Sequence, residues 1–477
     1  MYSVHNQKPK QMKTVPIIFT VVLPFALVGC ASTNPKAALN DVDKTVLART
    51  GQQIHGMSND VVNVWLQTNL TAQAAVTIAL LNNKSLQAEF EEIGISQADV
   101  AQASRLQNIE ITGSWRFPNR PPSAVDAGYT AAGNLLDLLT LPAKKKVAAR
   151  NLEQTKLKVA DKVLQLAADV QTVFYDLQAQ SELGKRLNSI IEVNAAAADV
   201  AQRQFDAGNI NELELKNQQA PAMQARLDSM KAGARMQAAR EHLNRLLGLS
   251  GEQINWQIAD ELPSLPEKEL PLENLESLAV SQRLDLAAAR SQAEAIAAAL
   301  RLKKKTRFIP GVKLGVDTER SPDGQRVTGP TLDLELPIFD QGQPAVARLT
   351  AEFQQARHNY AAQEVNVRSE VREARGALLA AREAVEFSQG NLLPQRQKIL
   401  RETLLHYNAM QKNSYELLAA KEREQNAEQS SIEALRDYWL ARVELERAVG
   451  GRLGGDLTPL VPPMKMDSAP EEHHHKP

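Results

Sequence analysis

Cys30 carries the only thiol in the 477-residue sequence. A disulfide within the chain is therefore impossible, and thiol chemistry at any other position is excluded. Cys30 follows the tripeptide Leu27-Val28-Gly29 and precedes Ala31 and Ser32. The sequence thus restricts cysteine chemistry, including acylation, to one position close to the N-terminus.

The residues around Cys30 resemble a bacterial lipobox, in which a lipoprotein signal peptidase cuts before a lipidated cysteine. Basic residues precede an apolar run over 15–28, which is too short to span a bilayer and suits a signal-peptide core. We expect 1–29 to be a signal peptide and Cys30 to be lipidated; the alternative is a chance cysteine behind an ordinary signal peptide. Ala31 stands where aspartate is associated with inner-membrane retention, which by this resemblance implies the outer membrane.

The other reactive residue types form no recognisable catalytic centre. The sequence has no Cys/His spacing for zinc, no phosphate-binding glycine loop and no Gly-x-Ser-x-Gly elbow. His473, His474 and His475 stand together near the C-terminus and can bind a metal transiently, but a disordered polar tail is the simpler interpretation. We therefore predict no enzyme activity, no cofactor and no resident metal.

Composition points to long helices that meet water. Lys and Arg number 55 and Asp and Glu number 56, so the formal net charge of -1 gives no reason to expect a nucleic-acid partner. Aromatic residues make up only 4%, while Ala, Leu, Gln, Glu and Arg dominate the middle of the chain. Mean hydropathy is -0.33, and no segment after the N-terminal run is apolar over the roughly 18 residues that a transmembrane helix needs.

The sequence contains an internal repeat. Leu86 lies about 200 residues before Leu286, and both follow a polar break between short helical patterns. Farther along, Phe205-Asp206-Ala207-Gly208 corresponds to Tyr407-Asn408-Ala409-Met410 at a shift of about 202. A nearly constant shift at two separate places indicates a duplicated unit.

This repeat divides the chain into segments. Three Leu-Pro pairs mark an extended linker between the copies, because proline disfavours helix in the residue before it. The expected segments are the signal peptide, a lipidated extension over 30–70, the first copy over 71–250, the linker over 251–274, the second copy over 275–453 and a disordered tail over 454–477.

Each copy begins with strand-like alternation of apolar and polar residues. The pattern is clear over 109–117, 312–317 and 332–338, with a turn signal over 321–324. The first copy lacks a clean second strand: 128–142 is apolar without alternation, so the strand there is expected to be short, irregular or partly helical. Its Pro142 aligns with Pro337 of the second copy.

Long helices follow the strands. The stretch over 144–205 would be about 90 Å long as a helix, and a return helix is expected over 211–247 with Gly248 as its stop. In the second copy, Gly390 and Pro394 should kink or divide the outgoing helix. Heptad seams run along both outgoing helices, through Leu152, Val159, Leu166 and Val173 in the first copy and through Val367, Val371, Ala374, Leu378, Ala381 and Val385 in the second.

Strands with one apolar and one charged face fit a closed barrel in lipid, where apolar side chains meet acyl chains and charged ones face water. An open sheet edge in hydrocarbon would leave backbone groups unpaired, so one copy of the chain, with about four strands, would have to oligomerise. The alternative is a soluble sheet with one buried face.

Three motifs in this order resemble the TolC family of outer-membrane efflux proteins: the turn at 205–208, the stop at 246–248 and the strand-to-helix passage at 336–342. The resemblance covers about 71–453. It implies a mainly α fold with a small β part, built from a duplicated unit of strands and a long helical hairpin. It further implies a trimer with an outer-membrane β-barrel of about twelve strands, a periplasmic α-helical barrel, and a gate at the hairpin tips.

The resemblance also carries site residues. In the family, a tyrosine and basic residues at the second tip hold the closed state, and acidic rings line the constriction. The matching residues are Tyr407, Lys412 and Glu416, with Asp206 and Glu214 in the first copy. In a trimer each carboxylate would form a ring of three that favours cations. The alternative is ordinary solvated charge at helical turns.

Two residues depart from the family pattern. Met410 stands where glycine is expected, which predicts a different bend at the second tip. Ala419 stands where a second acidic residue is expected, so that ring is missing.

Three functions fit these observations. The first is a passive export duct for drugs or metal ions, working with a periplasmic adaptor and an inner-membrane pump. The second is the adaptor itself, although adaptors carry one hairpin and this chain has two. The third is a structural coiled-coil lipoprotein without a pore, which would not need alternating strands. The resemblance favours the duct.

Overall fold

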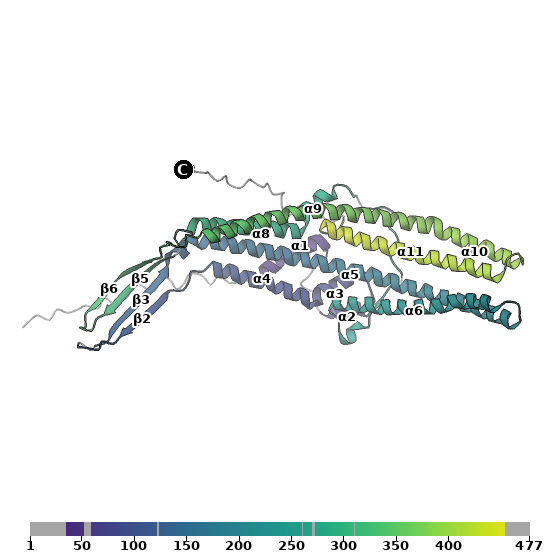
Figure 1. Ribbon diagram of the computed structural model, residues 1–477, viewed down its shortest axis with the longest axis horizontal. Helices are drawn as coiled ribbons and strands as arrows, with labels where there is room; N and C mark the ends of the chain where they lie inside the picture. Colours follow the sequence, from purple (N-terminus) through teal and green to yellow (C-terminus); the bar gives the residue numbers. More distant parts are fainter. Residues whose placement is uncertain are drawn as a thin grey trace, which may run out of the picture.

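The computed structural model describes residues 35–51, 59–121, 124–259, 261–269, 272–309 and 311–453. The expected signal peptide, Cys30 and the histidine tail lie outside these residues. The molecule is elongated, with a four-stranded sheet at one end, two helical hairpins reaching the other end, and shorter helices packed around the middle (Figure 1). This arrangement confirms the prediction of a mainly α fold with a small β part.

The elements follow the expected order of strands and helices in each copy. In chain order they are α1 (Pro35–Thr50), α2 (Asn59–Leu66), β1 (Asn69–Leu70), α3 (Ala72–Asn82), α4 (Lys84–Ala103), β2 (Glu110–Arg116), β3 (Asp126–Asn134), α5 (Leu135–Asp206), α6 (Glu212–Leu247), the 3-10 helix η2 (Gly251–Ile254), β4 (Gln257–Ile258), α7 (Leu275–Gln282), α8 (Leu284–Thr306), β5 (Val312–Arg320), β6 (Arg326–Leu334), α9 (Gln343–Phe387), the π-helix η3 (Ser388–Leu392), α10 (Leu393–Asn408) and α11 (Ser414–Val449).

The main sheet has the strand order β2-β3-β5-β6, and every neighbouring pair is antiparallel. The central pairing, β3 with β5, joins the two copies of the repeat. A separate parallel pair, β1 with β4, ties the N-terminal extension to the expected linker. Both hairpin copies therefore contribute equally to one sheet.

The expectation that 128–142 is partly helical is confirmed, whereas the equivalence of Pro142 and Pro337 and the bounds of the last strand need correction. In the first copy the chain is a strand only to Asn134, whose side chain accepts a hydrogen bond from the Leu136 amide at 3.0 Å and so starts α5. Pro142 consequently lies inside a helix, whereas Pro337 precedes α9, so the two prolines are not equivalent. In the second copy the last strand runs over 326–334, earlier than the predicted 332–338.

The predicted long helices form, and their predicted heptad seams face the apolar cores. Helix α5 has 72 residues and is therefore about 108 Å long at 1.5 Å per residue. The outgoing helix of the second copy is divided as expected: Pro394 cannot donate to the carbonyl four residues earlier, which belongs to Gly390 within η3. The predicted seam residues are buried or partly buried in two apolar cores.

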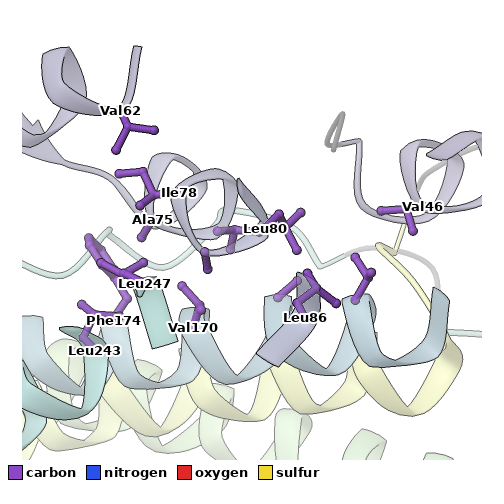
Figure 2. Close-up of a cluster of buried hydrophobic side chains, with 14 of the residues drawn as sticks. Val46, Val62, Ala75, Ile78, Leu80, Leu86, Val170, Phe174, Leu243 and Leu247 are labelled. Atoms are coloured by element: carbon purple, nitrogen blue, oxygen red, sulfur yellow. The ribbon is translucent and has the colours of Figure 1, made fainter. Parts of the chain in front are cut away.

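The first of these cores lies where the N-terminal helices cross α5 and α6 (Figure 2). Ile78 of α3, Phe174 of α5 and Leu243 of α6 are at most 2% exposed. Val46 of α1 is also fully buried, so the N-terminal extension is part of this core. The second core joins α7, α9 and α11.

The repeat is visible in matching contacts near the middle of the molecule. Asn83, at the break between α3 and α4, donates to the Leu246 carbonyl at 2.9 Å. Arg283, at the break between α7 and α8, donates to the Ala448 carbonyl at 3.5 Å. Both acceptors lie at the end of a return helix, 202 positions apart, so the duplicated unit found in the sequence is a duplicated structural unit.

No helix in the described part of the chain is both long and apolar enough to cross a bilayer.

Candidate functional site

One face of the main sheet is apolar and exposed. The register aligns Ile111 with Ala131, Ala131 with Val316, and Val316 with Pro330 across all four strands. Ile111 is 78% exposed and Val316 is 55% exposed. Further exposed apolar side chains on this face are Trp115, Tyr129, Leu314, Leu332 and Leu334. A contiguous apolar surface of this kind indicates contact with a partner or with lipid.

The opposite face of the sheet is polar. Lys313 forms an ion pair with Glu110 at 2.6 Å, and Thr130 donates to Asp317 at 2.8 Å. At the far end of the strands, Arg116 lies 3.5 Å from an oxygen of Asp126. The predicted alternation is therefore real: each strand contributes apolar side chains to one face and charged or hydroxyl side chains to the other.

The two hairpin tips lie at the opposite end of the molecule from the sheet (Figure 1). Gly208 has φ of 75° and Met410 has φ of 59°, both in the left-handed region. Each tip also repeats the same backbone bonds, from Gly208 to the Phe205 carbonyl at 2.8 Å and from Met410 to the Tyr407 carbonyl at 2.9 Å. The expectation that Met410 bends its tip differently is wrong, because the surrounding turn holds the methionine in the glycine conformation.

Two of the predicted acidic residues start the return helices. The Asn211 side chain accepts from the Glu214 amide at 2.9 Å, and Glu214 accepts from the Asn211 amide at 3.3 Å. Asn413 and Glu416 make the same reciprocal pair at 2.9 and 3.1 Å. These are capping boxes, which satisfy backbone donors that a helix start leaves unpaired. Both glutamates therefore have a structural role at their tip.

Lys412 and Glu416 are brought together as an ion pair on the second tip. The hydrogen bond from Lys412, together with that from the Asn413 amide, lowers the pKa of the Glu416 carboxyl. Both side chains remain exposed to solvent by more than 40%. The Glu416 carboxylate is thus ionised and faces water while it caps α11.

The remaining predicted residues do not join this pair. Asp206 accepts a hydrogen bond from Gln202 of its own helix at 2.8 Å. Tyr407 is 40% exposed at the end of α10. In the part of the chain that the structure describes, neither Asp206 nor Glu214 makes a hydrogen bond or ion pair with the second tip.

A contact that the sequence did not predict connects the two tips. The Tyr415 hydroxyl donates to the Gln204 side-chain oxygen at 2.6 Å, across 211 positions of sequence. Farther from the tips on the same two helices, Arg186 of α5 lies 3.5 Å from Glu428 of α11. Tyr415 stands beside Glu416 at the start of α11, but nothing in the local pattern identifies Gln204 as its partner.

Across the described ranges, no group of three or more His, Cys, Asp or Glu side chains is placed to hold an ion.

The model of the outer membrane efflux protein family matches the chain twice, over residues 75–249 and 275–451. These matches cover most of the sequence and correspond to the two structural copies. The duplicated architecture predicted from sequence is thereby confirmed, as is the resemblance to the TolC family.

Individual relatives agree with this assignment. The chain is 22% identical over 391 residues to the cobalt-zinc-cadmium resistance protein CzcC of Cupriavidus metallidurans, with 80% of this chain and 90% of CzcC covered. A solved structure of CusC, described in the context of transmembrane channel formation, superposes with a TM-score of 0.67 at 19% identity, covering 81% of this chain and 93% of CusC. The outer membrane protein VceC of Vibrio cholerae gives a TM-score of 0.67 at 14% identity, covering 80% of this chain and 96% of VceC. The chain therefore belongs to the outer membrane efflux protein family.

Proposed function

We propose that this protein is a passive export duct of the outer membrane. Three copies would join their four-stranded sheets into one barrel, with the apolar face against lipid and the polar face around water. The helical hairpins would continue the channel into the periplasm. The observation that supports this proposal best is the exposed apolar face, whose residues stay in register across every strand from β2 to β6.

Sheet edges supply a second argument for assembly. Strands β2 and β6 lie at the edges of the sheet in a single copy. Unpaired backbone groups at such edges are costly in hydrocarbon, so insertion requires β2 of one copy to pair with β6 of the next. A soluble sheet would instead bury its apolar face within its own chain.

Membrane attachment, partners and cargo extend the proposal. Lipid on Cys30 would anchor the chain after removal of 1–29, and 71–250 and 275–453 would act as two equivalent units joined by 251–274. A periplasmic adaptor and an inner-membrane pump would deliver drugs or metal ions and supply the energy. The name of CzcC concerns cobalt, zinc and cadmium resistance, which favours metal ions as cargo here.

We further propose that the tips form the gate. Tyr407 and Lys412 would help to hold the closed state, and Asp206, Glu214 and Glu416 would place carboxylates around the narrow end. The bond between Tyr415 and Gln204 is suited to hold the two hairpins of one copy together. Removing it should favour an open tip.

Planar-bilayer recording of the purified protein tests both proposals. We expect channel conductance from a trimer, and Tyr415→Phe should raise the open-to-closed ratio of each copy's tip about fivefold, because each copy loses one hydrogen bond of about 1 kcal/mol. Gln204→Ala should have the same effect, and the double variant should add nothing, because both changes remove one bond. A monomeric wild-type protein without conductance would refute the duct. If the wild-type protein conducts and the variants open no more often, only the proposed role of the bond between Tyr415 and Gln204 would be refuted.

A further inference from the structure

A cavity of about 700 Å³ lies near the middle of the molecule, away from both the sheet and the tips. It is a partly open cavity bordered by the end of α1, the start of α3, the middle of α5, the end of α11, Ala259 and residues from 261–268. Its volume falls in the range of small-molecule sites. One part of its wall is apolar and aromatic, with Leu70, Val76, Phe174 and Tyr175; Tyr175 stacks on Trp439 with ring centroids 5.2 Å apart.

Basic residues outnumber acidic ones in the rest of the wall. Among the described residues, five basic side chains line the cavity, against two acidic ones, Glu261 and Glu446. Two of the basic residues already have partners: Arg447 pairs with Glu444 at 2.6 Å, and Arg442 lies 3.5 Å from Glu269. Arg452 interacts electrostatically with the carboxyl of Glu446, which leaves Arg49 as the buried basic residue to be accounted for.

Arg49 is the most unusual of these residues. It is only 3% exposed, yet one of its terminal guanidinium nitrogens is buried without a hydrogen-bond partner among the described residues. Gln178 also lines the cavity, and its buried side-chain oxygen has no hydrogen-bond partner among the described residues either. A buried donor without an acceptor is costly, and a buried unpaired charge more so. Burial correspondingly lowers the pKa of the Arg49 guanidinium.

The chain around Gly451 packs closely against Arg49. The Arg452 amide donates to the Arg49 carbonyl at 3.0 Å, and a β-carbon at Gly451 would lie 3.3 Å from the Arg49 Cδ. The Arg452 guanidinium lies close by, since its NH1 would be 3.0 Å from a β-carbon on Gly51. Arg283 shows the usual solution for a buried arginine, because it pairs with both Asp285 and Glu370. Among the described residues, no carboxylate forms an ion pair with Arg49.

We propose that this cavity binds a small amphipathic organic anion. A carboxylate or phosphate on the ligand would accept hydrogen bonds from Arg49 and balance its charge. The apolar body of the ligand would lie against Phe174 and the stacked Tyr175 and Trp439. None of these side chains belongs to the main sheet or to the hairpin tips.

Calorimetric titration of the full-length protein in lipid nanodiscs tests the site with defined probes. We expect 4-phenylbutyrate and phenyl phosphate to bind, and the neutral isostere 4-phenylbutanol to bind about tenfold more weakly, as expected for one charge-assisted hydrogen bond. Inorganic phosphate should bind more weakly than phenyl phosphate, because it lacks the apolar body. Equal affinity for phenylbutyrate and phenylbutanol, or the absence of binding to the wild-type protein, would overturn the proposal; equal affinity for the two phosphates would overturn its apolar part.

Two variants locate the site. Arg49→Gln should weaken phenylbutyrate binding about tenfold and, without ligand, raise the melting temperature, because it removes an uncompensated buried charge. Arg203→Gln, at an exposed arginine paired with Asp199 far along α5, should change neither quantity. Unchanged affinity in Arg49→Gln would place any binding elsewhere, and a lowered melting temperature would show that Arg49 is a structural residue.

Discussion

Met410 adopts the same left-handed backbone conformation as Gly208, 202 positions earlier, although only one of the two is a glycine. Both residues follow a long outgoing helix and precede an asparagine-capped return helix. A side chain in this conformation brings Cβ close to the following carbonyl oxygen and costs roughly 1 kcal/mol. The second tip therefore carries strain that the first tip lacks.

Substituting each residue by the other should change the stability of the two tips in opposite directions. Met410→Gly should stabilise the second tip by about 1 kcal/mol, because Met410 is 95% exposed and its side chain contributes little packing. Gly208→Met should destabilise the first tip by a similar amount. No atom lies within 4 Å of a β-carbon there, so backbone strain is the whole cost and no steric clash adds to it. Hydrogen exchange at the amides of each tip measures both changes; the same sign for both variants would contradict the strain argument.

Glu416 combines a cap with a charge, and two substitutions can separate them. Glu416→Gln keeps an oxygen that can accept from the Asn413 amide, so the start of α11 should remain protected from hydrogen exchange. Glu416→Ala should lose the cap and raise exchange in that turn severalfold. If the tips line the pore, both variants should lower cation selectivity in bilayers equally.

The lowered pKa of Glu416 adds a pH dependence to that selectivity. Because the folded-state pKa is lowered, the Glu416 carboxylate stays ionised down to the ordinary glutamate pKa of about 4.3. Its negative charge is lost only as pH falls below that value. Selectivity that depends on Glu416 should thus be constant from neutral pH to about pH 5. A loss of selectivity near pH 6 would point to another group.

Gly248 should tolerate substitution less well than its counterpart Gly450. Both have positive φ, of 66° and 91°. A β-carbon at Gly248 would lie 2.7 Å from the Asn82 backbone oxygen, whereas at Gly450 the nearest atom, the Arg283 Cα, would be 3.2 Å away. We expect Gly248→Ala to cost about 3 kcal/mol of unfolding free energy and Gly450→Ala about half of that.

Gly233 offers the matched control for these two substitutions. It lies inside α6, and no atom approaches within 4 Å of a β-carbon there. Gly233→Ala should therefore stabilise the protein by up to about 1 kcal/mol. Thermal unfolding of the three variants gives the comparison, and equal costs at Gly248 and Gly450 would show that the Asn82 contact relaxes.

Asp161 should make stability depend on pH. Burial, with a smaller contribution from Asp285, raises its pKa from 3.8 to about 6. The folded protein then binds a proton between pH 6 and pH 4 that the unfolded chain does not, so this residue destabilises the fold at neutral pH and ceases to do so as pH falls through that window. Asp161→Asn should raise unfolding free energy at pH 7.5 by about 1–2 kcal/mol.

The pH profile distinguishes this effect from a general one. The gain from Asp161→Asn should shrink at pH 4.5, where the wild-type carboxyl is largely protonated. The Gln165 side chain donates to Asp161 at 2.8 Å, and asparagine can still accept that bond. Asp199→Asn, in an exposed pair with Arg203, should change stability by less than about 0.5 kcal/mol. A gain for Asp161→Asn that is independent of pH would contradict the assignment.

Sequence patterns predicted those parts of the fold that depend on neighbours along the chain. The seam residues Val159 and Val367, the breaks before Leu86 and Leu286, and the divided helix at Pro394 were all readable, because helical periodicity, caps and proline act within a few residues. The end of β3 could not be predicted from the sequence, since an apolar run without alternation fits a strand and a buried helix equally well.

By itself, the sequence determined the duplicated plan, the helical hairpins, the turns that end them and the two-faced character of the strands. The tertiary structure alone decided which groups from distant segments meet: Tyr415 with Gln204, Arg49 with the apolar wall around Phe174, and the carboxyl of Asp161 with that of Asp285. The physical reason is that periodicity reports which face of an element is apolar. Partners, burial and pKa values depend on how those faces pack across 200 residues of chain.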